Sequence, residues 1–470
     1  MTKGLASKAL LNEELATKQL AVNDLTSWLS YIESLHPKSI AMGLDRVNCI
    51  IERLALQPEF KIITVAGTNG KGSTCAMLEQ IYKQAGYRVG CYTSPHLIRY
   101  NERVRVNGVE VLDAELCTAF SAVNAARVGD GNREISLTYF EVGTLAAVWH
   151  FMQANIDIAI LEIGLGGRLD AVNAFEPNCA IVTSVDLDHQ DYLGDTRESI
   201  GFEKACVFRP SLPAICGDTN PPASLVSYAE KIKANFKCIH QDFDYKLAGN
   251  EWQYIQSGVV LHTLPCPALQ GIYQLSNATC AVAAVELLQN SLPVPVAAIA
   301  TAMRKVSLAG RFQKVSQSAL NSSRVYPQVI LDVAHNPHAA SALAQNLSAI
   351  KAQYSQAEVG KTFAVFAMLA DKDVKGVVEA VRNEIDAWYV ASIDHIRGAL
   401  ATNLASVIAD IIPNASIKTF DNANNAYQQA CIDMSENDKI IVFGSFFTVS
   451  SVIQLISDDG NLMTTQKFDL

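Results

Sequence analysis

The segment from Gly67 to Thr74, GTNGKGST, has the residue types of a phosphate-binding loop. It follows a β-branched run that ends at Ala66 and precedes a stretch with helical spacing, so it should join a strand to a helix. Such a turn offers phosphates free backbone N–H groups and the helix dipole, and Lys71 adds a positive charge. The match to G-x-x-x-x-G-K-[ST] is imperfect, because Val65 stands at the first glycine and Gly72 at the hydroxyl position. A glycine-rich turn without a ligand is the less favoured alternative.

Three polar residues lie where strands should end. Glu162 lies within the apolar run 156–163, Ser94 follows the run 88–93, and His189 follows the run 179–185. Since parallel strands have their carboxyl ends at one edge of a sheet, a carboxylate, an imidazole and a hydroxyl could together hold Mg²⁺ there. The alternatives are a structural ion pair for Glu162 and a loop hydrogen bond for His189. Nearby carboxylates compete as ligands, namely Asp186, Asp188 and Asp191.

Two further segments could approach a ligand. Residues 164–173, GLGGRLDAVN, contain three glycines that allow close backbone approach, with a tight turn as the alternative. A dinucleotide site is the weaker interpretation, because the segment lacks G-x-G-x-x-G. Arg99, Arg103 and Arg105 lie in a loop-like segment and suggest an anionic substrate; for any one of them, a solvated charged hairpin is the alternative.

The second half of the chain offers a cation and a carboxylate. Arg311, in AGRFQ, could reach phosphates across a cleft between domains, as a mobile arginine does in phosphoryl transfer. Asp332, in LDVAHNP, could hold a ribose or orient Arg311. The alternatives are an interdomain salt bridge for Arg311 and a helix cap for Asp332.

These residues are positioned by alternating strands and helices, which indicate an α/β fold. We expect a P-loop ATPase domain with a parallel sheet over residues 1–308 and a smaller Rossmann-like α/β domain over residues 309–470. The expected strands are 61–66, 88–93, 156–163, 179–185, 213–217, 328–333, 361–367, 386–391, 415–420 and 439–443. Hairpins are expected over 240–264, and helices over 15–56 with a break near Pro37, 72–85, 113–127, 139–155, 197–208, 222–235, 275–290 and 295–306. The ligand should bind between the domains.

Composition excludes several classes of protein. Of the 470 residues, 37 are Lys or Arg and 47 are Asp or Glu, so the net charge of −10 argues against a nucleic-acid or anionic-membrane binder. The 11 cysteines include no C-x-x-C pair, which argues against a zinc knuckle. No apolar run is long enough to span a membrane, and the first 30 residues lack an apolar secretory core. We expect a cytoplasmic monomer with reduced thiols.

Motifs from end to end resemble one family, that of dihydrofolate synthase/folylpolyglutamate synthase among the Mur-ligase-like amide ligases. The matching pieces, within residues 26–455, are TSWLSYIESLHPKSIAMGLDRV, VAGTNGKGST, TSPHLIRYNERVRV, LTYFE, LEIGLGGRLDAVN, VTSVDLDHQDYLG, ESIGFEKACVF, AGRFQ, LDVAHNPHAA, MLADKD and GSFFTVSSV.

The resemblance implies an ATP-dependent ligase that joins L-glutamate to dihydropteroate and adds further glutamates to folates through an acyl phosphate. It implies one or two Mg²⁺ ions, CO₂ bound as a lysine carbamate, and the catalytic residues Lys71, Arg311, Lys204 and His189. The implied ATP contacts are Thr68, Asn69, Gly70, Lys71, Gly72, Ser73, Asn277, Arg311 and Asp332. The implied metal ligands are Ser94, Glu162, His189 and Lys204. The implied pteroate contacts are Ala41, Met42, Gly43, Leu44, Thr138, Tyr139, Phe140, Glu141, Leu169, Asp170 and Ala171.

Two alternative functions remain at this point. A muropeptide ligase would share the fold and the chemistry, although the AMGL and LTYFE segments favour the folate branch. A P-loop regulatory NTPase would not need the segments that contain Glu162, Lys204 and Arg311. For Lys204 itself, the alternative is an ordinary surface lysine.

Overall fold

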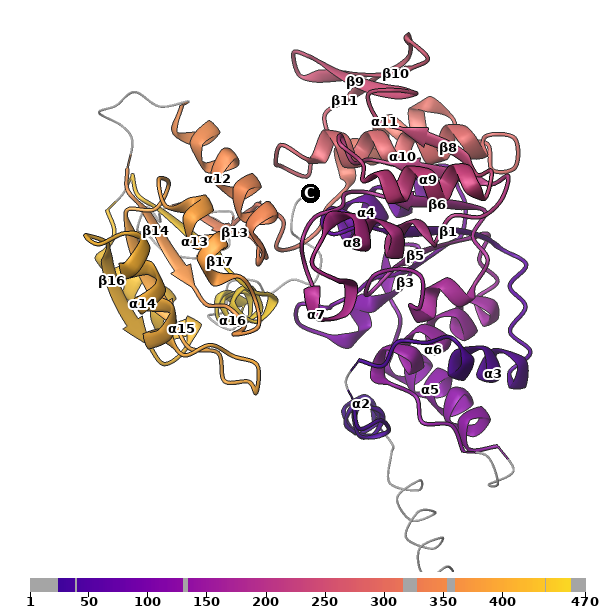
Figure 1. Ribbon diagram of the computed structural model, residues 1–470, viewed down its shortest axis with the longest axis horizontal. Coiled ribbons are helices and arrows are strands. Elements are labelled where there is room, and N and C mark those ends of the chain that lie inside the picture. The colour runs from indigo at the N-terminus through magenta and orange to yellow at the C-terminus, as the bar shows by residue number, and fades with distance from the viewer. Residues whose placement is uncertain are drawn as a thin grey trace, which may run out of the picture.

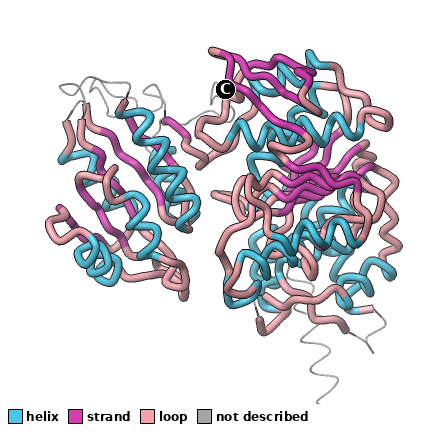
Figure 2. Tube along the Cα trace, turned by 45° about the horizontal axis from the view of Figure 1, so that its top comes forward, coloured by secondary structure: helices cyan, strands magenta, loops and turns pink. Residues whose placement is uncertain are grey.

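The computed structural model of the chain describes residues 24–38, 40–129, 134–315, 328–352, 360–435 and 437–457. The N-terminal two thirds form one lobe and the C-terminal third forms a second, smaller lobe beside it (Figure 1). Each lobe has a sheet of its own, with helices on both faces (Figure 2).

The sheet of the larger lobe has eight strands. In sheet order they are β4 (Val109–Glu110), β3 (Val104–Val106), β2 (Val89–Tyr92), β5 (Ile158–Glu162), β1 (Lys61–Ala66), β6 (Cys179–Val182), β7 (Pro213–Cys216) and β8 (Asn235–Cys238). From β2 to β8 all neighbours are parallel, whereas β3 and β4 add an antiparallel ribbon at one edge. The carboxyl ends of β1, β2, β5 and β6 therefore lie at one edge of the sheet, where the phosphate loop begins.

Both faces of this sheet are buried. Successive side chains of a strand point to opposite faces, and in the central strands the side chains on both faces are apolar. In β1, Ile62 and Ala66 belong to one core, and Ile63 and Val65 to the other. The first core is closed by α2 (Leu25–Ser34), α3 (Asp45–Arg53), α5 (Asp113–Val128), α6 (Tyr139–Gln153), α8 (Arg197–Ala205) and α9 (Ala223–Lys231). The second is closed by α4 (Lys71–Gln84), α10 (Gln274–Leu288), α11 (Val296–Lys305) and a small antiparallel sheet of β9 (Phe243–Ala248), β10 (Glu251–Gln256) and β11 (Val259–Pro265).

The smaller lobe has a six-stranded sheet. Its order is β12 (Gln313–Lys314), β13 (Gln328–Leu331), β17 (Lys439–Phe443), β14 (Thr362–Phe366), β15 (Ala387–Ala391) and β16 (Ser416–Phe420), all parallel except β12. One face carries α12 (Pro337–Lys351), α13 (Val374–Val381) and α14 (Ala401–Ile411), and the other α15 (Ala423–Asp433) and α16 (Phe446–Ile456).

The α/β fold class expected from the sequence is confirmed, and each expected strand and the hairpin region have a counterpart within the described residues. Two expectations were wrong in detail. The helix expected over 222–235 ends at Lys231, and Asn235–Cys238 form the edge strand β8. The arginine-rich segment is not a loop but a 3₁₀ turn, Tyr100–Arg103, followed by β3 and β4. β8 and β4 are short edge strands, and β3 beside β4 is also short, so their mixed burial leaves no clear alternation in the sequence.

Some of the expected helices and the expected linker cannot be compared with the structure. Residues 15–23 of the expected N-terminal helices and residues 316–327 of the expected linker lie outside the described residues. The boundary at residue 308/309 stays a prediction. Within the described ranges, no helix is both long and apolar enough to cross a bilayer.

Candidate active site

The phosphate loop leaves β1 at Gly67 and enters α4 at Lys71. Gly67 has φ +147°, and a Cβ there would lie 2.0 Å from Oγ1 of Thr183. Gly70, at φ +86°, is the residue before α4, and no side chain caps the helix. Both positions therefore require glycine, and the positive end of the α4 dipole meets the cavity that this loop lines.

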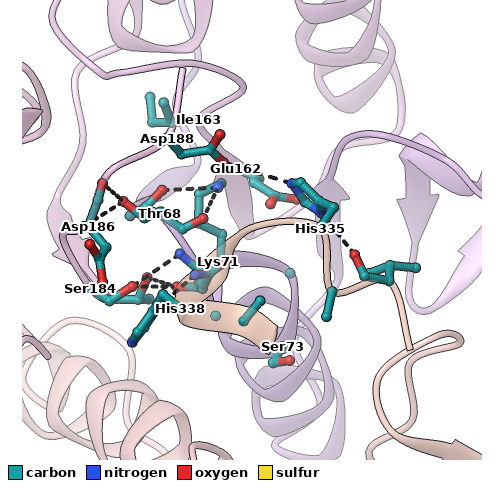
Figure 3. A pocket seen from close by; sticks show the side chains of 18 of the residues that line it. Thr68, Lys71, Ser73, Glu162, Ile163, Ser184, Asp186, Asp188, His335 and His338 are labelled. Atoms are coloured by element: carbon teal, nitrogen blue, oxygen red, sulfur yellow. Dashed lines mark hydrogen bonds and ion pairs between the residues drawn. The ribbon is translucent and has the colours of Figure 1, made fainter. Parts of the chain in front are cut away.

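That cavity has a volume of about 1050 Å³ and is lined by residues of both lobes. Figure 3 shows Lys71, Glu162, Asp188 and His335 around the same space. All of the expected nucleotide and metal residues line it, from Thr68 to Ser73 and at Ser94, Glu162, His189, Lys204, Asn277, Arg311 and Asp332. The structure thus brings together residues that are up to 264 positions apart in the chain, as Thr68 and Asp332 are.

Glu162, the last residue of β5, is only 4% exposed. Its Oε2 accepts a hydrogen bond from the backbone N–H of Ser94 at 3.1 Å. Burial raises the pKa of Glu162, and Lys71, the Ser94 N–H and Arg311 oppose that rise. Lys71 itself donates from Nζ to the carbonyl oxygens of Gly67 at 3.0 Å and Thr68 at 3.2 Å. Lys71 and Glu162 face the same cavity without forming an ion pair, so the expected alternative of a structural ion pair for Glu162 does not hold among the described residues.

His189 precedes the short helix α7 (Gln190–Leu193) with a left-handed backbone, φ +51°. Burial, together with Lys372 and Lys71, lowers the pKa of its imidazole to about 4 despite the neighbouring Asp188. The ring is therefore neutral near pH 7 and has a nitrogen lone pair available for a metal.

Of the three competing carboxylates, Asp188 and Asp186 line the cavity, whereas Asp191 does not. Asp188 accepts a hydrogen bond from Nζ of Lys372 in the smaller lobe at 2.6 Å. Burial alone would raise the pKa of Asp188, but His189, Lys372 and His335 beside it hold that pKa well below its usual range. Asp188 is thus engaged across the lobe boundary, a role that the sequence did not reveal because the partners are distant in the chain.

Lys204 lies near the C-terminus of α8 and is only 4% exposed, so it is not a surface lysine. Among the described residues, its Nζ forms neither a hydrogen bond nor an ion pair. Burial, and secondarily Lys71, lowers the pKa of Lys204 to about 7.

Arg311 extends from the smaller lobe to the phosphate loop. A Cβ placed on Gly72 would lie 3.7 Å from Nη2 of Arg311 and 4.0 Å from Oε2 of Glu162. Arg311 has no ion-pair partner within the described ranges; it donates to the carbonyl oxygen of Gly310 and stacks on Phe446. Among the described residues, Arg311 therefore forms no interdomain salt bridge, and its guanidinium can bind an anion in the cavity.

Asp332 does not cap a helix, since the residue before α12 that accepts its first-turn N–H is Asn336. The Asp332 carboxylate accepts backbone hydrogen bonds from Phe312 at 2.9 Å and Ala334 at 2.8 Å. Burial raises its pKa to about 6, in spite of the nearby Arg311. Asp332 thereby ties the residue after Arg311 to the segment that follows β13.

A second interdomain contact involves the phosphate loop directly. The side-chain amide of Asn69 bonds that of Asn336, at 3.2 Å in each direction, and its Nδ2 lies 2.8 Å from Nδ1 of His338. Asn336 and His338 belong to the N-terminal end of α12. The loop is therefore attached to the smaller lobe by its own side chain.

Most of the residues expected to contact a pteroate line the same cavity. They are Ala41, Met42, Thr138, Phe140, Glu141, Leu169, Asp170 and Ala171. Gly43, Leu44 and Tyr139 do not line it. The backbone N–H of Gly43 instead bonds the carbonyl oxygen of Leu169 at 3.4 Å, and the ring of Tyr139 packs against Tyr100.

Two buried carboxylates fix the backbone of the segments that contain these residues. Asp170 accepts hydrogen bonds from the backbone N–H groups of Gly164, Leu165 and Val172, which closes the glycine-rich loop. Glu141 accepts from the backbone of Thr138 at 2.7 Å and from Nη2 of Arg46 at 2.7 Å.

Arg46 is a residue that the sequence interpretation missed. Its Nη2 also donates to the carbonyl oxygen of Ala41 at 2.7 Å and so ties the 41–44 segment to α6. Its partner Glu141 is 95 residues away, so no local pattern signals the pair.

The basic stretch divides into three different environments. Arg105 is buried against Glu79 at 2.9 Å, and Arg99 pairs with Asp113 at 3.1 Å on the surface. Arg103 alone of the three lines the cavity.

Three of the donors that line the cavity suit a hard divalent cation. The described residues contain no group of three His, Cys, Asp or Glu side chains able to hold a metal by themselves. One carboxylate, the hydroxyl of Ser94 and the neutral His189 would instead complete a coordination shell with phosphate oxygens and water, which is how Mg²⁺ binds at nucleotide sites.

The chain is similar to known proteins over most of its length. Two family models match the chain, the Mur ligase middle domain over residues 65–285 and the Mur ligase glutamate ligase domain over residues 310–446. The dihydrofolate synthase/folylpolyglutamate synthase of Escherichia coli (strain K12) is 42% identical over 437 residues, which cover 93% of this chain and 96% of that protein.

Solved structures of similar proteins contain nucleotides and substrates. E. coli FolC in complex with DHPP and ADP superposes with a TM-score of 0.85 at 41% identity, covering 94% of this chain and 99% of that one. A bifunctional folylpolyglutamate synthase/dihydrofolate synthase with Mn, AMPPNP and L-glutamate bound has a TM-score of 0.82 at 42% identity, covering 93% and 99%.

Proposed function

The chain belongs to the dihydrofolate synthase/folylpolyglutamate synthase family of Mur ligases, and we propose from this premise how its residues join L-glutamate to pteroates and folates. It is an ATP-dependent ligase. The relationship favours this activity over a muropeptide ligase and over a P-loop regulatory NTPase. One observation carries the mechanism: the phosphate loop, the Ser94–Glu162 pair and Arg311 of the other lobe meet in one cavity.

ATP binds at the phosphate loop, with Thr68 to Ser73 around its phosphates and Asn277, Arg311 and Asp332 as further contacts. Support comes from the left-handed Gly70 at the start of α4, whose backbone packs against the side chain of Asn277. The acceptor, dihydropteroate or a folate, binds in the same cavity against Ala41, Met42 and Phe140, which line it. L-Glutamate enters from the side of the smaller lobe.

The first chemical step brings two anions together. An oxygen of the acceptor carboxylate bonds to the γ-phosphorus of ATP, the bond to the β,γ-bridging oxygen breaks, and ADP leaves. The α-amine of L-glutamate then bonds to the acyl carbon, inorganic phosphate leaves, and the amine proton passes to solvent. Lys71, Arg311 and the α4 dipole lower the barrier, because they are fixed where negative charge accumulates.

Magnesium would be held by Glu162, Ser94 and His189. When bound, it supplies positive charge to the phosphates. The support is the donor set itself: Oε2 of Glu162 accepts only the Ser94 N–H among the described residues, and the His189 ring is neutral.

Lys204 carries a carbamate that supplies a further metal-side oxygen. The bond forms between Nζ and the carbon of CO₂, and one amine proton passes to solvent. A buried amine without a partner favours this modification, because its cationic form is poorly solvated and its neutral form is the nucleophile.

The enzyme works as a cytoplasmic monomer. All groups invoked above come from a single chain. The 11 cysteines are all free thiols, which suits a reducing compartment.

The decisive assay is ADP release by the purified protein. It should require dihydropteroate and L-glutamate together, and a UDP-muropeptide should not replace the pteroate. ADP release that is independent of both substrates, or that depends on a muropeptide, would contradict the proposal.

A further inference from the structure

Among the cations of the cavity, Arg103 has no assigned task. Three others serve the nucleotide and metal end, namely Lys71, Lys204 and Arg311. Three more are neutralised by a carboxylate: Arg197 by Asp218 at 3.1 Å, Lys372 by Asp188 at 2.6 Å and Arg397 by Asp371 at 2.6 Å. Arg103 forms no ion pair with any carboxylate in the described part of the chain, although it lines the cavity.

The guanidinium of Arg103 is nevertheless held in one orientation. Its Nε donates to Nδ1 of His96 at 2.8 Å. Its planar group lies over the rings of Tyr100, at 5.4 Å, and Tyr139, at 5.6 Å. Burial, with the cationic Arg103 next to it, lowers the pKa of His96 to about 4, so the ring stays neutral and accepts this bond. A guanidinium fixed through Nε presents its terminal N–H groups as a fork, the shape that a carboxylate matches.

Arg103 contacts two segments that carry other residues of the cavity lining. Its carbonyl oxygen accepts from the backbone N–H of Thr93 at 2.9 Å, which sets it beside Ser94. On its other side, Tyr139 lies between Thr138 and Phe140, both of which line the acceptor pocket. Arg103 therefore lines the same cavity that has to hold both the acceptor and ATP.

The two acceptors differ there by one charge. Dihydropteroate ends in a single carboxylate, which reacts. A folate carries the reacting γ-carboxylate of its glutamyl group and also an α-carboxylate that does not react. Burying that second anion in the cavity would be costly without a cation.

We propose that Arg103 binds the non-reacting α-carboxylate of the glutamyl group of a folate and thereby sets the preference of the enzyme for folates over acceptors without this group. His96 is a positioning residue in this scheme, because it fixes the guanidinium through Nε. The inference rests on the proposed function, since it assumes that both acceptors occupy the same cavity.

The test uses three acceptors with the full-length enzyme: dihydropteroate, a reduced monoglutamyl folate, and an analogue of that folate in which γ-aminobutyrate replaces glutamate. The analogue keeps the reacting carboxylate and lacks the α-carboxylate. Wild-type enzyme should favour the folate over the analogue by about tenfold or more in kcat/KM, the usual worth of a charge-assisted hydrogen bond. Arg103→Met should remove most of that preference, mainly through KM for the folate.

Arg99→Met is the matched control, because Arg99 lies in the same segment and pairs with Asp113 on the surface. It should keep the wild-type preference. Arg103→Lys retains the charge and the stem but not the planar fork, so it should retain only part of the preference.

Two results would overturn the inference. One is an Arg103→Met enzyme that keeps the wild-type preference, or that loses activity equally with the folate and the analogue while its thermal unfolding is unchanged. The other is a wild-type enzyme without any preference, which decides the matter even if every variant misfolds. Failure of the proposed function itself looks different, because the wild type would then release no ADP with dihydropteroate and L-glutamate.

Discussion

Replacing Lys204 with alanine should abolish ligase activity, and small carboxylates should restore part of it. The side chain lies buried near the metal end of the cavity, where its Nζ has no hydrogen-bond partner among the described residues. If it carries a carbamate, alanine removes an anionic oxygen ligand rather than a cation. Acetate or formate can occupy the vacated space and supply that oxygen, whereas ammonium or methylamine should not help.

The structure also gives the size and the sign of the pH effect. An ordinary lysine with a pKa of 10.5 is neutral in about one molecule in three thousand at pH 7, whereas a pKa of about 7 leaves roughly half of the Lys204 amines neutral. The neutral amine is the form that attacks CO₂. Carbamate formation should therefore increase as the pH rises through about 7 and decrease below it.

The assay is ADP release in CO₂-depleted buffer and in bicarbonate buffer, at several pH values on both sides of 7. The static question is answered by electron density, where a carbamate appears as three extra atoms beyond Nζ. Lys231→Ala on the exposed side of α9 is the control, since an isolated surface charge contributes only about 0–1 kcal/mol. Wild-type activity in the Lys204→Ala enzyme, or a bare amine in a crystal with ATP and Mg²⁺ bound, would refute the reasoning.

Three other substitutions probe the remaining parts of the site. Lys71→Ala should reduce both activities by at least about a hundredfold, because it removes a fixed charge from the phosphoryl-transfer step. Thermal unfolding should be unchanged, and turnover close to wild type would refute the assignment of Lys71 to the ATP site. Glu162→Gln should shift activity to higher Mg²⁺ concentration, because an amide binds the cation less well than a carboxylate; an unchanged Mg²⁺ titration would make Glu162 purely structural. Arg46→Met should raise KM for dihydropteroate and lower the free energy of unfolding by about 1–3 kcal/mol, because it leaves Glu141 buried without its cation. Chemical denaturation and steady-state kinetics check both effects of the Arg46 change, and an unaltered KM would show that the 41–44 segment does not need this anchor.

The sequence was most informative where a periodic pattern and a turn coincide. The β-branched run before Gly67 and the helical spacing after Lys71 correctly predicted β1 and α4, because a buried parallel strand and a packed helix each impose their own period. The same rule placed Glu162 and Ser94 at neighbouring strand ends, and the structure joins them by a hydrogen bond. Edge elements carried less information, as β8 shows: it is short and half exposed.

Long-range pairing accounts for what the sequence could not provide. Arg46 and Glu141, or Asp188 and Lys372, are ordinary charged residues in their own segments, and only the folded chain makes them partners. A local sequence motif can also include a residue that does not reach the site. Tyr139 belongs to a segment expected to contact the pteroate, but this first residue of α6 does not line the cavity, and its ring packs against Tyr100.

The bonds between Asn69 and the N-terminal end of α12 have a thermodynamic consequence. The loop that cradles phosphates is the same loop that holds the smaller lobe. Nucleotide affinity and lobe apposition are therefore linked equilibria, and linkage is reciprocal. If lobe apposition changes the affinity of the loop for ATP, then bound ATP changes the stability of the apposed lobes by the same free energy. A substitution at Asn336, 267 positions from Asn69 in the chain, should therefore change nucleotide binding.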